Sequence, residues 1–146
     1  GQRVRAGAVR LRARRWGALL VLERQTYLTE SADTGVPVNA EVRAPLLEAL
    51  FSPESPLHDG AVILRGRNIL AAGCTLPLAD RSESSSPQLG TRHRAAQGVT
   101  EVSDAVAIVI SEERGVVSVA ADGRLTTVRH PPDLGALLRT LLPVTA

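Results

Sequence analysis

Short apolar runs, separated by polar turns, recur along most of the chain. Most are four to seven residues long, a length typical of buried strands. Two central runs are separated only by Arg65 to Asn68, which indicates an antiparallel hairpin. Pro37 lacks an amide donor and so predicts that its strand lies at a sheet edge. We expect strands over residues 18–22, 36–39, 61–64, 69–75, 106–110, 116–120 and 124–128.

Longer segments between these runs have the spacing of helices. The last of them carries five leucines between positions 134 and 142, placed to form one apolar face. Pro45 is tolerated in a first helical turn, and Ser52 with Pro53 ends that helix. We expect helices over residues 3–15, 42–51, 92–102 and 134–142, with loops over 29–35 and 79–89.

The 146 residues are expected to form one domain, because no repeat or change in composition divides them. The longest apolar run, Trp16 to Leu22, has seven residues, whereas a membrane-spanning helix needs about 20. The single cysteine, Cys74, allows no disulfide framework and favours a reducing compartment. We expect Cys74 to be a buried, unreactive thiol on a strand.

The net charge of +2 is unevenly distributed. Six arginines and no acidic residue lie within residues 1–15, whereas the other 131 residues carry 11 arginines and 15 acids. This basic helix predicts a solvated face, with contact to anionic lipid as the alternative. One Trp, one Tyr and one Phe provide no platform for stacking bases, which argues against a nucleic-acid partner. Without any methionine, the chain is expected to come from a longer protein.

The segment Gly90–Ala96 has the composition of a phosphate site. Gly90 permits a tight turn, and Thr91 is expected to be the N-cap of the following helix. Arg92 and Arg94 add two guanidinium groups, and backbone donors at a helix start favour the same anion. His93 is a candidate for phosphate contact or proton transfer.

A second group, His58 to Ala61, lies where a loop enters a predicted strand. Asp59 offers a carboxylate oxygen to a hard cation such as Mg²⁺, whose other ligands are usually phosphate oxygens and water. Gly60 lets a ligand approach the backbone closely. A third polar group, Ser111, Glu112 and Glu113, ends another predicted strand.

Each of these groups also has a purely structural explanation. An isolated Asp-Gly pair commonly forms a turn. The arginines of residues 92–94 are placed to make weak surface ion pairs with Glu101 and Asp104, and His93 to pack in the core. Their joint occurrence in one small domain favours a nucleotide site.

Residues Pro56–Ile63 and Gly90–Ala96 resemble the signature motifs of the diadenylate cyclase domain, and the similarity extends over roughly residues 3–130. The order and spacing of the blocks are most similar to the membrane-anchored type. The resemblance implies an α/β fold with a mixed central sheet flanked by helices. It also implies condensation of two ATP molecules into cyclic di-AMP and two pyrophosphates, with Mn²⁺ or Mg²⁺, or Co²⁺ as a third candidate, between two facing copies of the domain.

The resemblance implies roles for individual residues as well. Asp59 is expected to hold the metal, with His58, Glu112 and Glu113 as weaker candidates. The residues expected to act on the phosphate chain are Thr91, Arg92, His93 and Arg94. Those expected to contact the rest of ATP are Gly60, Ala61, Thr75, Leu76 and Ser111.

Two further expectations follow from the resemblance. The membrane-anchored type has transmembrane helices before this domain, which places the domain at the cytoplasmic face of the cell membrane. Thr75 stands where the family often has a tyrosine that stacks on adenine, a contact worth about 1 kcal/mol. This departure leaves a second hypothesis open, a regulatory module that binds nucleotide without turning it over.

Overall fold

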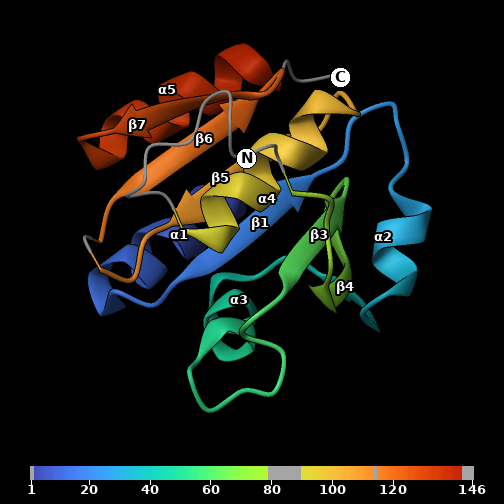
Figure 1. Ribbon diagram of the computed structural model, residues 1–146. Coiled ribbons are helices and arrows are strands. Elements are labelled where there is room, and N and C mark those ends of the chain that lie inside the picture. The colour runs from blue at the N-terminus through green and yellow to red at the C-terminus, as the bar shows by residue number, and fades with distance from the viewer. Residues whose placement is uncertain (1, 79–89, 114, 143–146) are drawn as a thin grey trace.

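A seven-stranded mixed β-sheet forms the centre of the molecule, and helices cover both of its faces (Figure 1). The computed structural model describes residues 2–78, 90–113 and 115–142. The strand order is β2-β4-β3-β1-β5-β6-β7. The strands are β1 (Ala18–Leu22), β2 (Val36–Glu41), β3 (Ala61–Arg65), β4 (Asn68–Cys74), β5 (Val106–Ile110), β6 (Val117–Ala121) and β7 (Arg124–Val128). The expected α/β class is confirmed.

The central strands are apolar on both faces because both faces are covered. In β1, Leu20 and Leu22 pack into one core cluster, and Leu19 and Val21 pack into the other. β1 is parallel to β3 and antiparallel to β5. A strand buried on both sides has a continuous apolar sequence, which explains why these strands were predictable.

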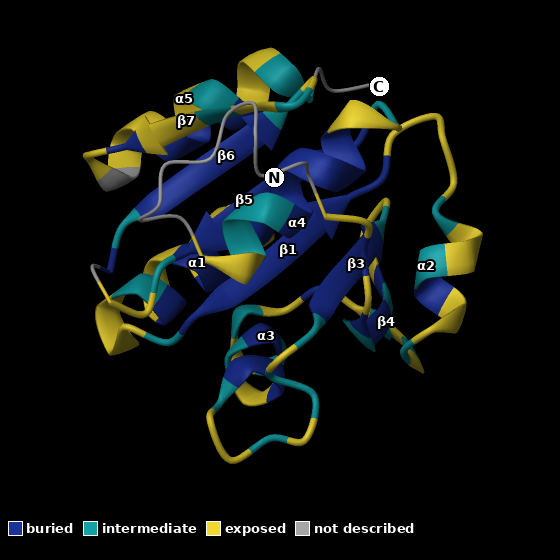
Figure 2. Cartoon of the chain, viewed as in Figure 1, coloured by how far each residue is buried: buried dark blue, intermediate teal, exposed yellow. Residues whose placement is uncertain are grey.

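The helices form two layers around the sheet (Figure 1). α1 (Gln2–Arg14), α3 (Ala44–Phe51) and α5 (Pro131–Leu141) cover one face, and α2 (Thr29–Asp33) and α4 (Thr91–Glu101) cover the other. Figure 2 shows that the central strands and the inward sides of the helices are buried, while the edge strands and the outer sides of the helices are largely exposed. No helix among the described residues is long and apolar enough to span a bilayer.

The predicted basic helix is present as α1, and several of its arginines contact acids of this chain. Arg3 hydrogen-bonds Glu41, and Arg10 and Arg14 form ion pairs with Glu48. The Arg3 hydrogen bond, helped by the charge of nearby arginines, holds the pKa of Glu41 below its ordinary value. These contacts favour the structural explanation of the basic segment, since they attach α1 to β2 and α3.

Four elements differ from the sequence prediction by more than one residue. Part of the expected loop over 29–35 is the short helix α2, whose polar sequence lacks an apolar period. β2 extends to Glu41, with an irregular register between Pro37 and Ala40. α3 begins at Ala44 and α5 at Pro131, because prolines fit the first helical turn. The predicted loop over 79–89 lies outside the described residues.

The sheet topology places three segments at one end of the sheet. β1 and β3 are parallel and begin after Gly17 and Gly60, whereas the antiparallel β5 ends there, before Ser111. We call this the Gly17 end of the sheet. Glu23, Arg65 and Asp104 mark the other end, which we call the Glu23 end.

Candidate nucleotide site

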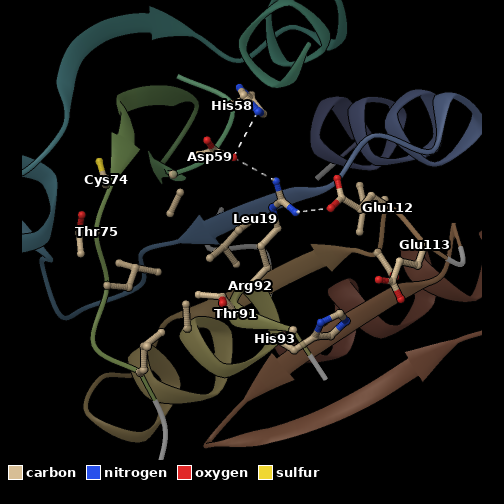
Figure 3. Close-up of a pocket in the computed structure, with 18 residues that line it drawn as sticks. Leu19, His58, Asp59, Cys74, Thr75, Thr91, Arg92, His93, Glu112 and Glu113 are labelled. Atoms are coloured by element: carbon tan, nitrogen blue, oxygen red, sulfur yellow. Dashed lines mark ion pairs between the residues drawn. The ribbon is translucent and has the colours of Figure 1, made fainter. Parts of the chain in front are cut away.

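A cavity of about 870 Å³ lies at the Gly17 end of the sheet (Figure 3). All of the predicted site residues except Arg94 line this cavity: His58, Asp59, Gly60, Ala61, Thr75, Leu76, Thr91, Arg92, His93, Ser111, Glu112 and Glu113. They come from segments that are far apart in the sequence. The topology therefore brings the three predicted polar groups to one place.

A row of polar side chains forms the polar side of the cavity (Figure 3). His58 Nε2 lies 3.2 Å from Asp59 Oδ1, which lies 4.0 Å from Arg92 Nη2. Arg92 Nη1 in turn lies 3.9 Å from Glu112 Oε1. The two arginine contacts are longer than hydrogen bonds, so the guanidinium keeps its donors available for a closer anion.

Arg92 is held in place although its ion pairs are loose. Its side chain is only 21% exposed, and its buried Nε has no hydrogen-bond partner among the described residues. The guanidinium lies directly over Gly17, where a Cβ atom would be 2.3 Å from Nη1. A desolvated cation with unused donors is suited to phosphate oxygens.

The first turn of α4 adds backbone donors to the polar side. Thr91 was expected to be the N-cap, but the N-cap is Gly90, which has extended backbone and no side-chain cap bond. Thr91 is therefore the first helical residue, and it lines the cavity. The amides of a first helical turn lack intrahelical partners, so they favour an anion at this position.

The two neighbours of Arg92 in the motif are placed differently. His93 lines the cavity on the side nearer Glu113 (Figure 3). Arg94 is not among the residues that line it, because side chains two positions apart point to opposite sides of a helix. The structure thus brings Arg92 to the cavity without Arg94, and the expected role of Arg94 in phosphate binding gains no support.

Buried apolar groups form another part of the cavity lining, which we call its apolar side. They include Leu19, Ala61, Cys74, Leu76 and Ala95. Burial raises the pKa of the Cys74 thiol to about 11, so this thiol stays neutral near pH 7, as expected. Such a surface suits a flat heteroaromatic group, and the polar side suits its phosphates.

The backbone beside Leu76 is fixed by a bond from another element. The Thr75 amide donates to Thr34 Oγ1 at 2.8 Å, and the Thr34 hydroxyl donates to the Ser31 carbonyl at 2.6 Å. Thr75 itself is exposed. The end of α2 therefore fixes the backbone that follows β4, the segment that includes Leu76 on the apolar side of the cavity.

Several residues of the site were not predicted. Gly17, Leu19 and Ile110 contact Arg92 or line the cavity, yet each occupies what looks in the sequence like an ordinary core position. A glycine directly before a buried strand, repeated at Gly60, was the one available signal. Their role depends on pairing between distant segments.

The side chains near Asp59 could hold a metal ion only if a bound nucleotide supplied further ligand atoms. Asp59 Oδ1 and His58 Nε2 are neighbouring acceptors, since His58 Nδ1 lies 2.7 Å from the Ser55 carbonyl and donates to it. Two such acceptors 3.2 Å apart suit a shared cation. Among the described residues, no three His, Cys, Asp or Glu side chains are grouped to hold a metal alone. Phosphate oxygens would complete the coordination.

Comparison with known families agrees with this geometry. The family model DAC, described as DisA bacterial checkpoint controller nucleotide-binding, matches residues 5–125. The chain belongs to this family. The resemblance inferred from the motifs at residues 56–63 and 90–96 is confirmed, since both motifs lie within the matched region.

Individual relatives match over most of this DAC chain. It is 53% identical to cyclic di-AMP synthase CdaA of Bacillus subtilis over 77% of this chain and 41% of the relative. A crystal structure of DacA from Staphylococcus aureus aligns with a TM-score of 0.92 and 41% identity, over 98% of this chain and 95% of that chain. A structure described as a hypothetical membrane spanning protein from Bacillus cereus aligns with a TM-score of 0.83 and 45% identity, over 88% and 63%. The chain spans about half the length of the curated relatives it matches.

Proposed function

We propose that this chain is the catalytic domain of a diadenylate cyclase, which condenses two ATP molecules into cyclic di-AMP and two pyrophosphates. The observation that carries the proposal is a single cavity with an apolar side at Leu76 and a polar side at Arg92 and the start of α4. The names of its relatives, cyclic di-AMP synthase and diadenylate cyclase, support the same reaction.

In this proposal the adenine lies on the apolar side and the phosphates on the polar side. Arg92 binds phosphate oxygens together with the first-turn amides of α4, and Thr91 adds a hydroxyl donor. Gly60 and Ala61 present backbone to the nucleotide. These contacts hold the α-phosphorus in position for in-line attack.

The reaction forms two bonds and breaks two. Each 3′-hydroxyl oxygen bonds to the α-phosphorus of the other ATP, and the bond from that phosphorus to pyrophosphate breaks. The hydroxyl protons pass to solvent. Asp59 and His58 would hold a divalent ion, Mn²⁺ or Mg²⁺ or else Co²⁺, with Glu112 and Glu113 as weaker candidates. When bound, such an ion neutralises phosphate charge and polarises the phosphorus centre.

The reaction requires a second copy of the domain. One cavity of about 870 Å³ has the size of a single small-molecule site, whereas the reaction needs two ATP molecules. Asp59 is 86% exposed and Glu112 is 64% exposed, so the polar side is open to a facing copy. We expect the rate to rise more steeply than linearly with protein concentration where dimer is scarce. Strict proportionality from a demonstrated monomer would contradict this requirement.

The direct test is incubation of the purified chain with ATP and Mn²⁺, Mg²⁺ or Co²⁺. We expect cyclic di-AMP and pyrophosphate in a ratio of one to two, measured by chromatography and a phosphate-release assay. If nucleotide binds but no product forms with any metal at any protein concentration, the cyclase proposal fails.

A second candidate function is a nucleotide-binding regulatory module. The observation that favours it is that no Phe, Tyr or Trp lines the described part of the cavity, and Thr75 stands at the expected stacking position. Calorimetry with ATP and with cyclic di-AMP distinguishes the two functions when it accompanies the turnover assay. Tight binding of cyclic di-AMP without turnover would support the regulatory module.

We also propose that the full-length protein places this domain at the cytoplasmic face of the membrane. The description of the Bacillus cereus relative as membrane spanning supports this placement. Fractionation of cells that express the full-length protein tests it, and recovery entirely in the soluble fraction would contradict it.

A further inference from the structure

Gly17 is a buried residue between α1 and β1. A larger residue at this position would collide with a neighbouring side chain. An ideal Cβ atom at this position would lie 2.3 Å from Arg92 Nη1, 2.6 Å from Cζ and 3.1 Å from Nη2. Gly17 does not have a positive φ, unlike Gly66 and Gly73. Backbone conformation therefore does not explain the glycine, whereas the space taken by the Arg92 guanidinium does.

The polar contacts of this guanidinium are loose. Its ion pairs with Asp59 and Glu112 are 4.0 and 3.9 Å long, and its Nε has no hydrogen-bond partner among the described residues. Space is available around it, because Arg92 also lines a second cavity of about 450 Å³ beside Trp16 and Phe51. The missing side chain at Gly17 therefore leaves the space that the guanidinium occupies.

We propose that Gly17 is a positioning residue for phosphate binding, because it provides the surface on which the Arg92 guanidinium lies. A methyl group at residue 17 displaces the guanidinium from the polar side of the cavity. The colliding atoms are the far end of a flexible side chain, so the sheet itself need not move. This inference rests on the proposed function in one respect, namely that the anion bound by Arg92 is a nucleotide phosphate.

The test compares Gly17→Ala with Gly135→Ala. Gly135 is a matched control, since a Cβ atom there also meets arginine side chains, Arg5 Cδ at 3.1 Å and Arg139 Nη1 at 3.3 Å, on α5 away from the cavity. With ATP or inorganic tripolyphosphate as the probe, we expect Gly17→Ala to weaken binding about tenfold, the size of one charge-assisted hydrogen bond. Gly135→Ala should bind both probes like the parent chain.

A double-mutant cycle tests whether Gly17→Ala weakens binding through the Arg92 side chain. If Gly17 acts through the guanidinium, Gly17→Ala has no further effect on binding in an Arg92→Ala background. The same cycle applies to the melting temperature. Should Gly17→Ala destabilise the fold through the collision, removing the Arg92 side chain restores the melting temperature. Equal effects of Gly17→Ala with and without Arg92 would overturn the proposal.

A measurement without ligand separates this inference from the cyclase proposal. The Arg92 Nε–Hε resonance, assigned by its absence in Arg92→Lys, should change in chemical shift and exchange faster with solvent in Gly17→Ala, and remain unchanged in Gly135→Ala. This result with no cyclic di-AMP formed would leave the positioning role intact and reject the enzyme. An unchanged resonance in an active cyclase would reject the positioning role alone.

Discussion

Each end of β1 and β3 has an arginine close to a carboxylate, but the pair is tightly hydrogen-bonded at one end and loose at the other. At the Glu23 end, Glu23 is 1% exposed and contacts Arg65 Nε at 2.6 Å and Nη2 at 3.3 Å. It also accepts the Leu28 amide at 2.6 Å, and the Arg65 guanidinium lies 3.9 Å from the Tyr27 ring centroid. At the Gly17 end, the shortest contact between Arg92 and Asp59 is 4.0 Å, and Asp59 is 86% exposed.

This difference separates a structural ion pair from a candidate binding site. The Glu23 carboxylate has its acceptors filled by three donors, so it raises the pKa of Arg65 by hydrogen bonding and holds the following loop in place. The Gly17 end keeps an arginine and a carboxylate close together with their hydrogen-bonding capacity unused. Ligand binding would satisfy these groups, which the fold alone does not.

The largest difference between the two ends should appear on replacing Asp59. Asp59→Asn removes the charge that would hold the metal, and we expect turnover to fall by about 100-fold or more. The melting temperature should not change, because the side chain is exposed and weakly paired. The control Asp33→Asn removes an exposed carboxylate on α2 and should have no effect. Full cyclase activity in Asp59→Asn would reject our metal assignment.

At the Glu23 end the effect should be on stability. Glu23→Gln leaves Arg65 without its charged partner, and we expect a loss of about 1–3 kcal/mol in the free energy of unfolding. Glu41→Gln is the matched control, since its arginine contacts are exposed to solvent and should contribute much less to stability. Urea unfolding measures both variants. Equal stability losses would mean that the hydrogen bonds to Glu23 contribute little.

A smaller effect should distinguish the apolar side of the cavity from its polar side. Thr34→Val removes the acceptor of the Thr75 amide, and we expect ATP to bind about two- to tenfold more weakly, the size of one neutral hydrogen bond. Tripolyphosphate, which has no base, should bind equally well. Thr34→Ser keeps the hydroxyl and should restore ATP binding. Equal losses for ATP and tripolyphosphate would show that Thr34 does not act through the base.

The smallest effect should be a pH dependence at the Glu23 end. Asp104 accepts the Thr26 and Gln25 amides at 3.0 Å each, and these bonds lower its pKa from the ordinary value of 3.8. A lowered pKa stabilises the fold above the ordinary value, and this stabilisation is lost as the pH falls through the lower value in the folded state. The protection factors of the amides of residues 25 and 26, which correct for the intrinsic pH dependence of exchange, should therefore fall as the pH drops below the ordinary value of 3.8. Asp104→Asn should remove this pH-dependent change. If the change persists in this variant, a group other than Asp104 causes it.

The sequence predicted what depends on local pattern. The buried strands, the hairpin and most helices follow from apolar periodicity, and the motifs at residues 58–61 and 90–96 both contribute residues to the candidate cavity. Glu101 and Asp104 were suggested as partners of the arginines, but Arg92 lies instead near Asp59 and Glu112.

What the sequence did not predict depends on contacts between distant segments. The pair of Glu23 and Arg65, and the contact of Gly17 with Arg92, join residues 42 and 75 positions apart. Only the register of β1 beside β3 and β5 brings such residues to the same end of the sheet. The packing of α4 on the sheet likewise decides which side of the helix faces the cavity, and it places Arg92 there but not Arg94.

We propose that nucleotide binds at the Gly17 end of the sheet and not at the Glu23 end. An amide-resolved NMR titration of the chain with a non-hydrolysable ATP analogue and Mg²⁺ distinguishes the two ends. We expect saturable shifts at Gly17, Gly60 and Thr91, with residues 23–28 unchanged. Shifts centred on residues 23–28, with none at Gly60 or Thr91, would contradict it.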